Sequence, residues 1–237
     1  MVMRASGDQN LLVMTLYIIG IAYTFNRMIE SIDDQIKVKL DKGKIEEDLK
    51  AENLAGQIAI SFTIKDKYSD TDPKELSMKI ENKSQSITVY VDWDNCSVIG
   101  HDKRSRRMIR KSPDPSRDLA VAQITSVIGP NSSLSETISA EDVFKRDEKT
   151  GIYTASTPIV NIPGMEKHPV KAVRQGYKDF MGRKKKFDFQ FRLSMRVVDT
   201  AVSASANPGD SRLCIVTCPF TIEKLHWSYA MPWNKKR

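Results

Sequence analysis

Residues 86–100 read SITVYVDWDNCSVIG, and this stretch decides the fold. Apolar side chains occupy every second position from Ile87 to Trp93, and polar side chains stand between them. Because successive side chains of a β-strand point to opposite faces, the alternation predicts a strand with one buried face. An indole on such a face fills the space between packed layers, and its truncation to alanine costs roughly 3–5 kcal/mol. We therefore predict that Trp93 is a structural core residue.

The same alternation recurs in most of the chain after residue 57. Strands are predicted in QIAISFTIKD (57–66), ELSMKIEN (75–82), VAQITSVIGPNSSLSETIS (121–139), KFDFQFRLSMRVVD (186–199) and SRLCIVTCPFTIEKL (211–225). Turn-forming residues separate these segments. About seven short strands spaced in this way predict an all-β fold, specifically an immunoglobulin-like antiparallel β-sandwich.

The N-terminal run LLVMTLYIIGIAYTF, residues 11–25, has no charged side chain. As a helix it would cover about 22 Å, against about 30 Å for the hydrocarbon core of a bilayer, so flanking residues or local thinning must complete the span. An uncleaved single-pass membrane anchor is the first interpretation, and a cleaved signal peptide or a buried helix are the alternatives. The side of the membrane that carries the remaining chain stays open.

These patterns divide the chain into four expected parts. They are an anchor or signal-like segment (1–26), a charged stalk (27–56), a β-sandwich (57–225) and an aromatic and basic tail (226–237). Within the stalk, IKVKLDKGKI alternates with period two while the preceding isoleucines have helical spacing. Strand and helix therefore both remain open for this segment.

The chain is basic, with 37 Lys and Arg against 30 Asp and Glu and a net charge of +7. Such a balance favours contact with polyanions, including nucleic acid and acidic lipid head groups. Two clusters concentrate the charge, KRSRRMIRK (103–111) and GRKKKF (182–187). Single-strand nucleic-acid binders interleave stacking aromatics with basic residues, which neither cluster does. Because an apolar anchor is also predicted nearby, lipid head groups are favoured over nucleic acid. The predicted anion-contacting residues are Arg104, Arg106, Arg107, Arg183, Lys184, Lys185 and Lys186.

The sequence offers little for catalysis or metal binding. Its three histidines are far apart and have no companions at metal-ligand spacing. It has no G-x-S-x-G elbow, glycine-rich phosphate loop or HExxH motif. We therefore expect no metal, no cofactor, no small-molecule substrate and no enzymatic activity.

Three cysteines cannot all pair within the chain. Cys214 and Cys218, if they lie on one strand, are roughly 13 Å apart, too far for a disulfide with each other, although either could meet Cys96. We expect all three to be small buried apolar side chains.

The C-terminal tail HWSYAMPWNKKR is rich in large aromatic side chains. Exposed apolar surface of this kind usually docks onto something, here the domain itself, a partner protein or a membrane interface. We assign Trp227, Tyr229 and Trp233 as partner-binding residues.

Four segments resemble an uncharacterised group of bacterial envelope domains, often lipid-anchored. They are LSMKIENKSQSITVYVDW (76–93), CSVIGHDKRSRRMIR (96–110), SVIGPNSSLSETISAEDVF (126–144) and KKKFDFQFRLSM (184–195). The resemblance spans residues 58–193 and implies an immunoglobulin-like sandwich without an assigned activity. The chain departs from the group in lacking the lipid-attachment cysteine, in having Gly100 at an expected acidic turn position, and in its residues after 199.

Together these observations predict a non-catalytic, membrane-tethered protein-interaction or complex-assembly module with a protein partner. The alternative is a soluble basic binder of nucleic acid or anionic lipid surfaces.

Overall fold

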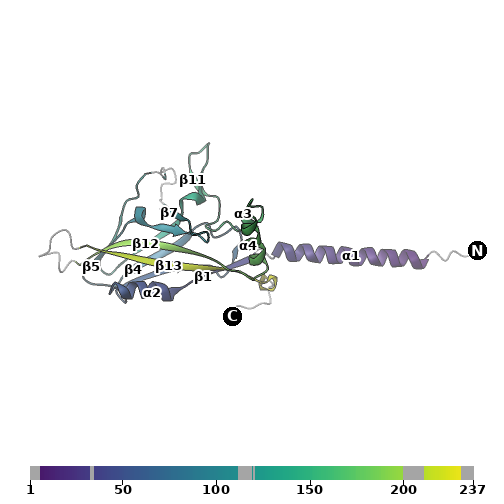
Figure 1. The fold of residues 1–237 in the computed structure, drawn as a ribbon, viewed down its shortest axis with the longest axis horizontal. Coiled ribbons are helices and arrows are strands. Elements are labelled where there is room, and N and C mark those ends of the chain that lie inside the picture. The colour runs from purple at the N-terminus through teal and green to yellow at the C-terminus, as the bar shows by residue number, and fades with distance from the viewer. Residues whose placement is uncertain (1–5, 33–34, 112–118, 120, 200–210, 231–237) are drawn as a thin grey trace, which may run out of the picture. The chain divides into compact units, whose positions relative to one another are not determined.

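The computed structural model describes residues 6–32, 35–111, 119, 121–199 and 211–230. It divides the chain into two compact units, Met1–Gln35 with Leu225–Arg237, and Ile36–Lys224, which we call the β unit. The helices are α1 (Ser6–Ile32), α2 (Lys42–Ala51), α3 (Pro163–Glu166) and α4 (Lys171–Met181), with short 3-10 helices η1 (Trp93–Asn95), η2 (Glu141–Val143) and η3 (Trp227–Ala230). Figure 1 shows α1 as one continuous helix.

Thirteen strands are described. They are β1 (Gln35–Leu40), β2 (Ile58–Thr63), β3 (Tyr68–Ser69), β4 (Leu76–Asn82), β5 (Ile87–Val91), β6 (Ser97–Ile99), β7 (Ser105–Arg110), β8 (Ser126–Ile128), β9 (Ser132–Ala140), β10 (Phe144–Arg146), β11 (Tyr153–Ala155), β12 (Phe187–Asp199) and β13 (Arg212–Lys224). Every segment predicted to be a strand contains at least one of them, because alternation reports local backbone geometry directly.

Within the described residues, 11 strands form one sheet in the order β2-β4-β9-β7-β6-β12-β13-β1-β3, with β5 and β8 continuing from β12. The pairing is antiparallel, and the 13-residue strands β12 and β13 form the long central hairpin, with Phe187 opposite Ile222 and Val197 opposite Arg212. The β10–β11 pair stands apart from the sheet.

The sheet is curled. Its two edge strands, β2 and β3, are separated by only the four residues 64–67. Phe62 on edge strand β2 packs its ring 5.0 Å from Phe220 on β13 and 6.0 Å from Phe191 on β12, although several strands lie between them along the sheet. The protein is therefore mostly β, with a curled antiparallel sheet and an N-terminal apolar helix.

Trp93 lies fully buried in the core, with 0% of its surface exposed. The strand predicted to carry it ends at Val91, and Trp93 begins the 3-10 helix η1 instead. Its indole Nε1 donates to Ser126 Oγ at 2.9 Å, and the Arg110 guanidinium lies 5.7 Å from its ring centroid. Arg110 also donates to Ser126 Oγ at 3.0 Å and to Glu136 Oε1 at 3.2 Å. The indole thus has both an apolar shell and a partner for its buried N–H.

The charged segment 27–56, expected to be a stalk, is divided among three elements. Its first residues belong to α1, whereas β1 pairs with β13 and α2 packs on β13. The Asp41 carboxylate caps α2 by accepting from the Gly43 and Lys44 amides, and Asp48 of α2 accepts from the Thr217 amide of β13 at 2.8 Å. This segment is charged on one side only: Ile36, Val38, Ile45 and Leu49 are all buried. The expected sandwich boundary at residue 57 therefore falls inside the β unit.

Candidate functional site

The turn between β6 and β7 forms the first wall of a groove in the β unit. Gly100 and Arg104 close it through the Gly100 N–H, which donates to the Arg104 carbonyl at 3.1 Å. Asp102 accepts from the Arg104 amide at 3.2 Å, and Lys103 has a φ of 61°. A Cβ on Gly100 would lie 2.7 Å from Asp102 Oδ1, so glycine lets the turn close tightly. The turn projects His101 and Lys103 beyond the strands.

The loop after α4 forms the second wall. Arg183 adopts a φ of 60°, and its N–H donates to the Phe180 carbonyl at 2.8 Å. The next amide, that of Lys184, donates to the Asp179 carbonyl at 2.8 Å, which completes a Schellman motif around Gly182. This cap ends the helix and turns the chain into β12, and it places Lys184, Lys185 and Lys186 in an exposed loop.

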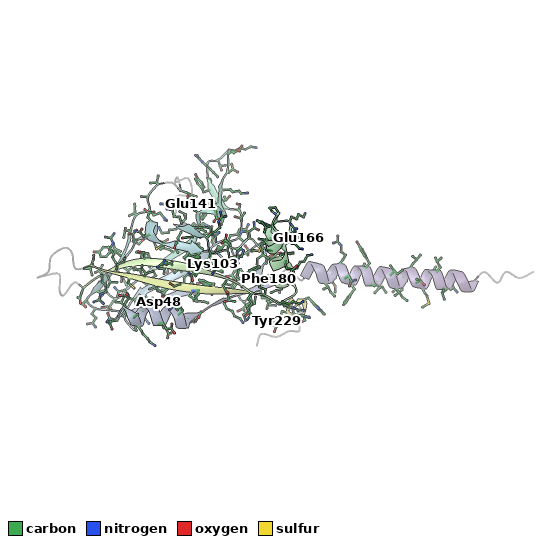
Figure 2. All side chains as sticks on the ribbon, viewed as in Figure 1. Asp48, Lys103, Glu141, Glu166, Phe180 and Tyr229 are labelled. Carbon is green, nitrogen blue, oxygen red and sulfur yellow. The ribbon has the colours of Figure 1, made fainter. Side chains whose placement is uncertain are left out.

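Phe187 joins the two walls. Its ring stacks on Phe180 of α4 at 4.9 Å and meets the edge of the His101 ring at 5.0 Å, and it is 3% exposed. Phe180 and Glu166 mark the end of the β unit where α3 and α4 lie (Figure 2). Both basic walls are therefore attached to one buried aromatic stack.

Between the walls lies a groove of about 590 Å³, which we call the basic groove. Its lining includes His101, Lys103, Lys185, Lys186, Phe187 and Asp188. The two clusters found in the sequence thus meet in space, Lys103 from one and Lys185 and Lys186 from the other.

The charges in the groove are engaged to different degrees. Lys186 pairs with Glu223 at 2.7 Å, and Glu223 also pairs with Lys39 at 2.6 Å, so the pKa of that carboxyl is lowered, chiefly by its bond to Lys186. Lys103 and Lys185 make no ion pair with any described residue, and the Lys185 ammonium lies 5.6 Å from the Phe187 ring centroid. Neither ammonium group lies within ion-pair distance of a described carboxylate, although Asp188 lines the same groove.

His101 is the titratable ring of the groove. Desolvation beside its packed neighbours lowers its pKa below the ordinary histidine value, while Asp102 opposes the shift and Lys185 adds to it. The imidazole is therefore mostly neutral at pH 7, and a bound anion would raise its pKa.

The other predicted anion-contacting residues have different surroundings. Arg104 is 83% exposed, and its nearest carboxylate, that of Asp102, is 3.9 Å away. Arg106 Nη1 donates to both carboxylate oxygens of Asp142 at 3.0 Å, and Nη2 donates to the Ile159 carbonyl at 2.9 Å. Arg107 pairs with Asp94 and donates to the Leu119 carbonyl at 2.8 Å. The guanidinium groups of Arg106 and Arg107 thus connect neighbouring parts of the fold.

Sequence reasoning did not select His101, Lys103 or Phe187 as site residues. Lys103 stood at the start of a quoted basic cluster, so its charge was visible. Neither the contact of the Phe187 ring with His101 nor the approach of His101 to Lys185 could be found, because these contacts join segments more than 80 residues apart.

A second open cleft of about 600 Å³ lies beside the Glu75–Lys111 ion pair, between the β2–β4 connection and β11. The N–H of Lys65 donates to the Tyr68 hydroxyl there at 3.0 Å. Lys111 is paired with Glu75 there at 2.8 Å, and Lys65, Lys74 and Asp72 line the same cleft.

The tail residues belong to the first unit. Trp227 and Tyr229 lie in η3, which contacts α1, and the Trp227 ring is 5.3 Å from that of His226. Tyr229 is 48% exposed. The predicted partner-binding residue Trp233 lies outside the described residues.

All three cysteines are buried and free. Burial raises the pKa of Cys96 to about 12 and that of Cys214 to about 11, and it raises the pKa of Cys218 as well. Over the part of the chain that the structure describes, no group of three or more His, Cys, Asp or Glu side chains is arranged to hold a metal ion.

Helix α1 contains a 20-residue stretch, Asn10–Ile29, that is apolar enough to cross a membrane, and none of it is buried. A signal sequence near an N-terminus or the core helix of a soluble protein would meet the same criteria of length and composition.

Comparison with known proteins gives no family-model match and no matching curated protein. A solved structure, the X-ray structure of Northeast Structural Genomics Consortium target SoR45, aligns with 77% of this chain and 97% of its own at 10% identity. The TM-score is 0.29, a level of similarity that assigns neither a fold nor a function.

Proposed function

We propose that the protein is a non-catalytic, membrane-tethered module for protein interaction or complex assembly. The observation that supports this most directly is the exposure of α1 on all sides. Leu11, Leu12, Val13 and Met14 are between 60% and 71% exposed, and consecutive residues point about 100° apart around a helix. A helix that is apolar all round is stable when it is buried in protein or in a membrane, so lipid is the environment that suits α1.

The chain connectivity adds a positional argument. The β unit begins at Ile36, opposite Lys224 in the register, and Phe187 lies opposite Ile222, so the chain enters the unit at the end where the basic loop precedes β12. The backbone from Ile32 to Ile36 can span at most about 14 Å. An anchor in α1 would therefore hold this end of the β unit close to the membrane surface.

The thiols and the tail support a binding role over a catalytic one. A thiol with a pKa near 12, such as that of Cys96, stays protonated at neutral pH and is a poor nucleophile. Trp227 and Tyr229 present aromatic surface in the unit that contains α1, where a protein partner in or at the membrane would meet them. We also propose that the curled sheet is an immunoglobulin-like β-sandwich, as the sequence predicts.

Alkaline carbonate extraction of membranes that contain the full chain tests the tether. We expect the wild type and the control Val127→Lys, which changes an exposed residue of β8, to stay in the membrane pellet. Ile18→Lys combined with Ile21→Lys should release the chain, because each lysine near a helix centre costs about 3 kcal/mol of insertion free energy. Release of the wild type, or a mature chain that lacks α1 by mass spectrometry, would contradict the proposal.

A further inference from the structure

We propose that the basic groove binds the phosphate of an anionic lipid head group. This inference rests on the proposed function, because the lipid would belong to the membrane that holds α1. The groove supplies cations from two walls, Lys103 from the β6–β7 turn and Lys185 and Lys186 from the loop after α4.

Two of these three lysines have no ion-pair partner among the described residues. Neither Lys103 nor Lys185 forms an ion pair with a described residue, whereas Lys186, the third lysine of the groove, pairs with Glu223. A phosphate offers several acceptor oxygens to such ammonium groups and takes them without a fixed approach angle.

The carboxylates near the groove are occupied. Asp188 accepts from the Thr221 hydroxyl at 2.7 Å, and Asp102 accepts from the Arg104 amide. Glu223 lies between Lys39 and Lys186. Their negative charges are therefore partly compensated before a ligand arrives, which reduces the repulsion that a phosphate would meet.

The walls are preorganised. The Schellman cap after α4 and the hydrogen-bonded turn between β6 and β7 are both packed on Phe187, so the two lysine-bearing segments keep their separation without the ligand. Binding then orders only the lysine side chains, which limits its entropic cost.

The groove also lies where a head group would be available. In the strand register Phe187 lies opposite Ile222, and Ile36 lies opposite Lys224. These residues therefore share the end of the sheet that receives the chain from α1. Figure 1 shows α4 at this end of the β12–β13 hairpin. A soluble polyanion needs no such placement, whereas a membrane lipid does.

Lysine footprinting of the full chain in nanodiscs tests the inference. Acetylation rates of Lys103 and Lys185, read by mass spectrometry, should be about fivefold lower in phosphatidylglycerol-containing discs than in phosphatidylcholine discs, the factor for one lysine at an anionic surface. Lys145 and Lys149, exposed lysines outside the groove lining, should react equally in both. Equal rates for the groove lysines in both discs would overturn the proposal.

Matched variants test the residues. Glycerol 1-phosphate titrated into the full chain in non-ionic detergent should bind roughly 25-fold more weakly to Lys103→Gln with Lys185→Gln than to the wild type, given about fivefold per lysine. Lys145→Gln with Lys149→Gln removes the same charge and should change the affinity less than about twofold. Equal losses in the two double variants would reduce the effect to net charge and refute the groove.

His101 gives an independent readout. NMR titration should show its pKa rising when glycerol 1-phosphate is present, against the lowering that burial, Lys185 and Arg106 impose and in the same direction as the effect of Asp102. An unchanged His101 pKa at saturating ligand would overturn the assignment.

Other anions define the remaining outcomes. Inorganic phosphate that protects Lys103 and Lys185 in phosphatidylcholine discs as well as phosphatidylglycerol does would overturn the lipid source. A single-stranded oligonucleotide that displaces the chain from anionic lipid at lower concentration than glycerol 1-phosphate would reassign the groove to nucleic acid. The two proposals also fail separately: release by carbonate refutes the tether, whereas a retained chain with unprotected lysines refutes only the groove.

Discussion

The hydrogen bond between Trp93 and Ser126 gives a quantitative test of the core. Ser126→Ala removes the acceptor of the indole N–H while leaving the fully buried ring in place. A buried donor without a partner costs about 1–3 kcal/mol. Arg110 loses one acceptor as well but keeps Glu136 at 3.2 Å, so its contribution to the loss is small.

The reverse change, Trp93→Phe, leaves no orphaned group. Ser126 Oγ retains the Arg110 donor at 3.0 Å, and the cost is about 1–2 kcal/mol for the lost hydrogen bond and the smaller ring. In the Trp93→Phe background the indole N–H is absent, so Ser126→Ala no longer leaves a buried indole donor without an acceptor. The two changes should therefore be non-additive, with a coupling free energy of about 1–2 kcal/mol.

Urea unfolding of the full chain in one non-ionic detergent, followed by far-UV circular dichroism, measures the four members of this cycle. Midpoints should shift at a constant slope, because the surface exposed on unfolding hardly changes. Ser133→Ala, on the exposed part of β9, is the control and should cost less than about 0.5 kcal/mol. If Ser126→Ala costs as much in the Trp93→Phe background as in the wild type, the buried N–H bond contributes nothing and the reasoning fails.

Three further predictions concern the groove and the thiols. Arg183→Gly should stabilise the β unit by about 0.5–1 kcal/mol in the same urea assay, because glycine adopts the observed φ of 60° without strain; a loss of stability would contradict this. Lys186 and Lys39 lower the pKa of Glu223, so the ionised carboxylate stabilises the fold above the unfolded-state glutamate pKa, and this stabilisation is lost as pH falls through the folded-state value. In Glu223→Gln, urea midpoints measured against pH should fall less steeply on the acid side. An unchanged pH profile would refute the pairing. Cys96 should resist a thiol reagent at pH 8 in the folded chain and react after unfolding, because its pKa is raised to about 12; rapid reaction of the folded chain would show that it is exposed.

Local hydrophobic alternation in the sequence predicted much of the fold. Alternation placed β4, β12 and β13, because each has one face in the core and each period-two pattern reflects that face. It could not place the end of the strand before Trp93, since Asp92 and Trp93 continue the alternation while the backbone already turns into η1. The buried environment of the indole followed from its apolarity and not from its strand.

The curl of the sheet and the use of β1 depend on distant partners. In the sequence Phe62 is an ordinary strand residue. Only its contacts with the aromatic rings of β12 and β13 show that the edge strand folds over the sheet. Ile36 and Val38 alternate with lysines, a pattern that suits a strand, yet the strand exists because β13 pairs with it. Pairing across more than 170 residues leaves no local signal.

The arginines and lysines of the two basic clusters have separate roles, which composition alone could not distinguish. Arg106 and Arg107 each bind a carboxylate and a backbone carbonyl together, which the rigid planar fork of a guanidinium permits. Lys103 and Lys185 lie in turns, where a flexible ammonium has no such set of acceptors around it. The arginines of β7 therefore join the β strands to their neighbouring loops, and the positive charge that remains for a ligand comes from the lysines. Because Lys103 and Lys185 lie in different sequence clusters, their convergence depends on Phe187 holding the β6–β7 turn and the end of α4 together. The proposed binding surface is therefore a product of the core rather than of either cluster.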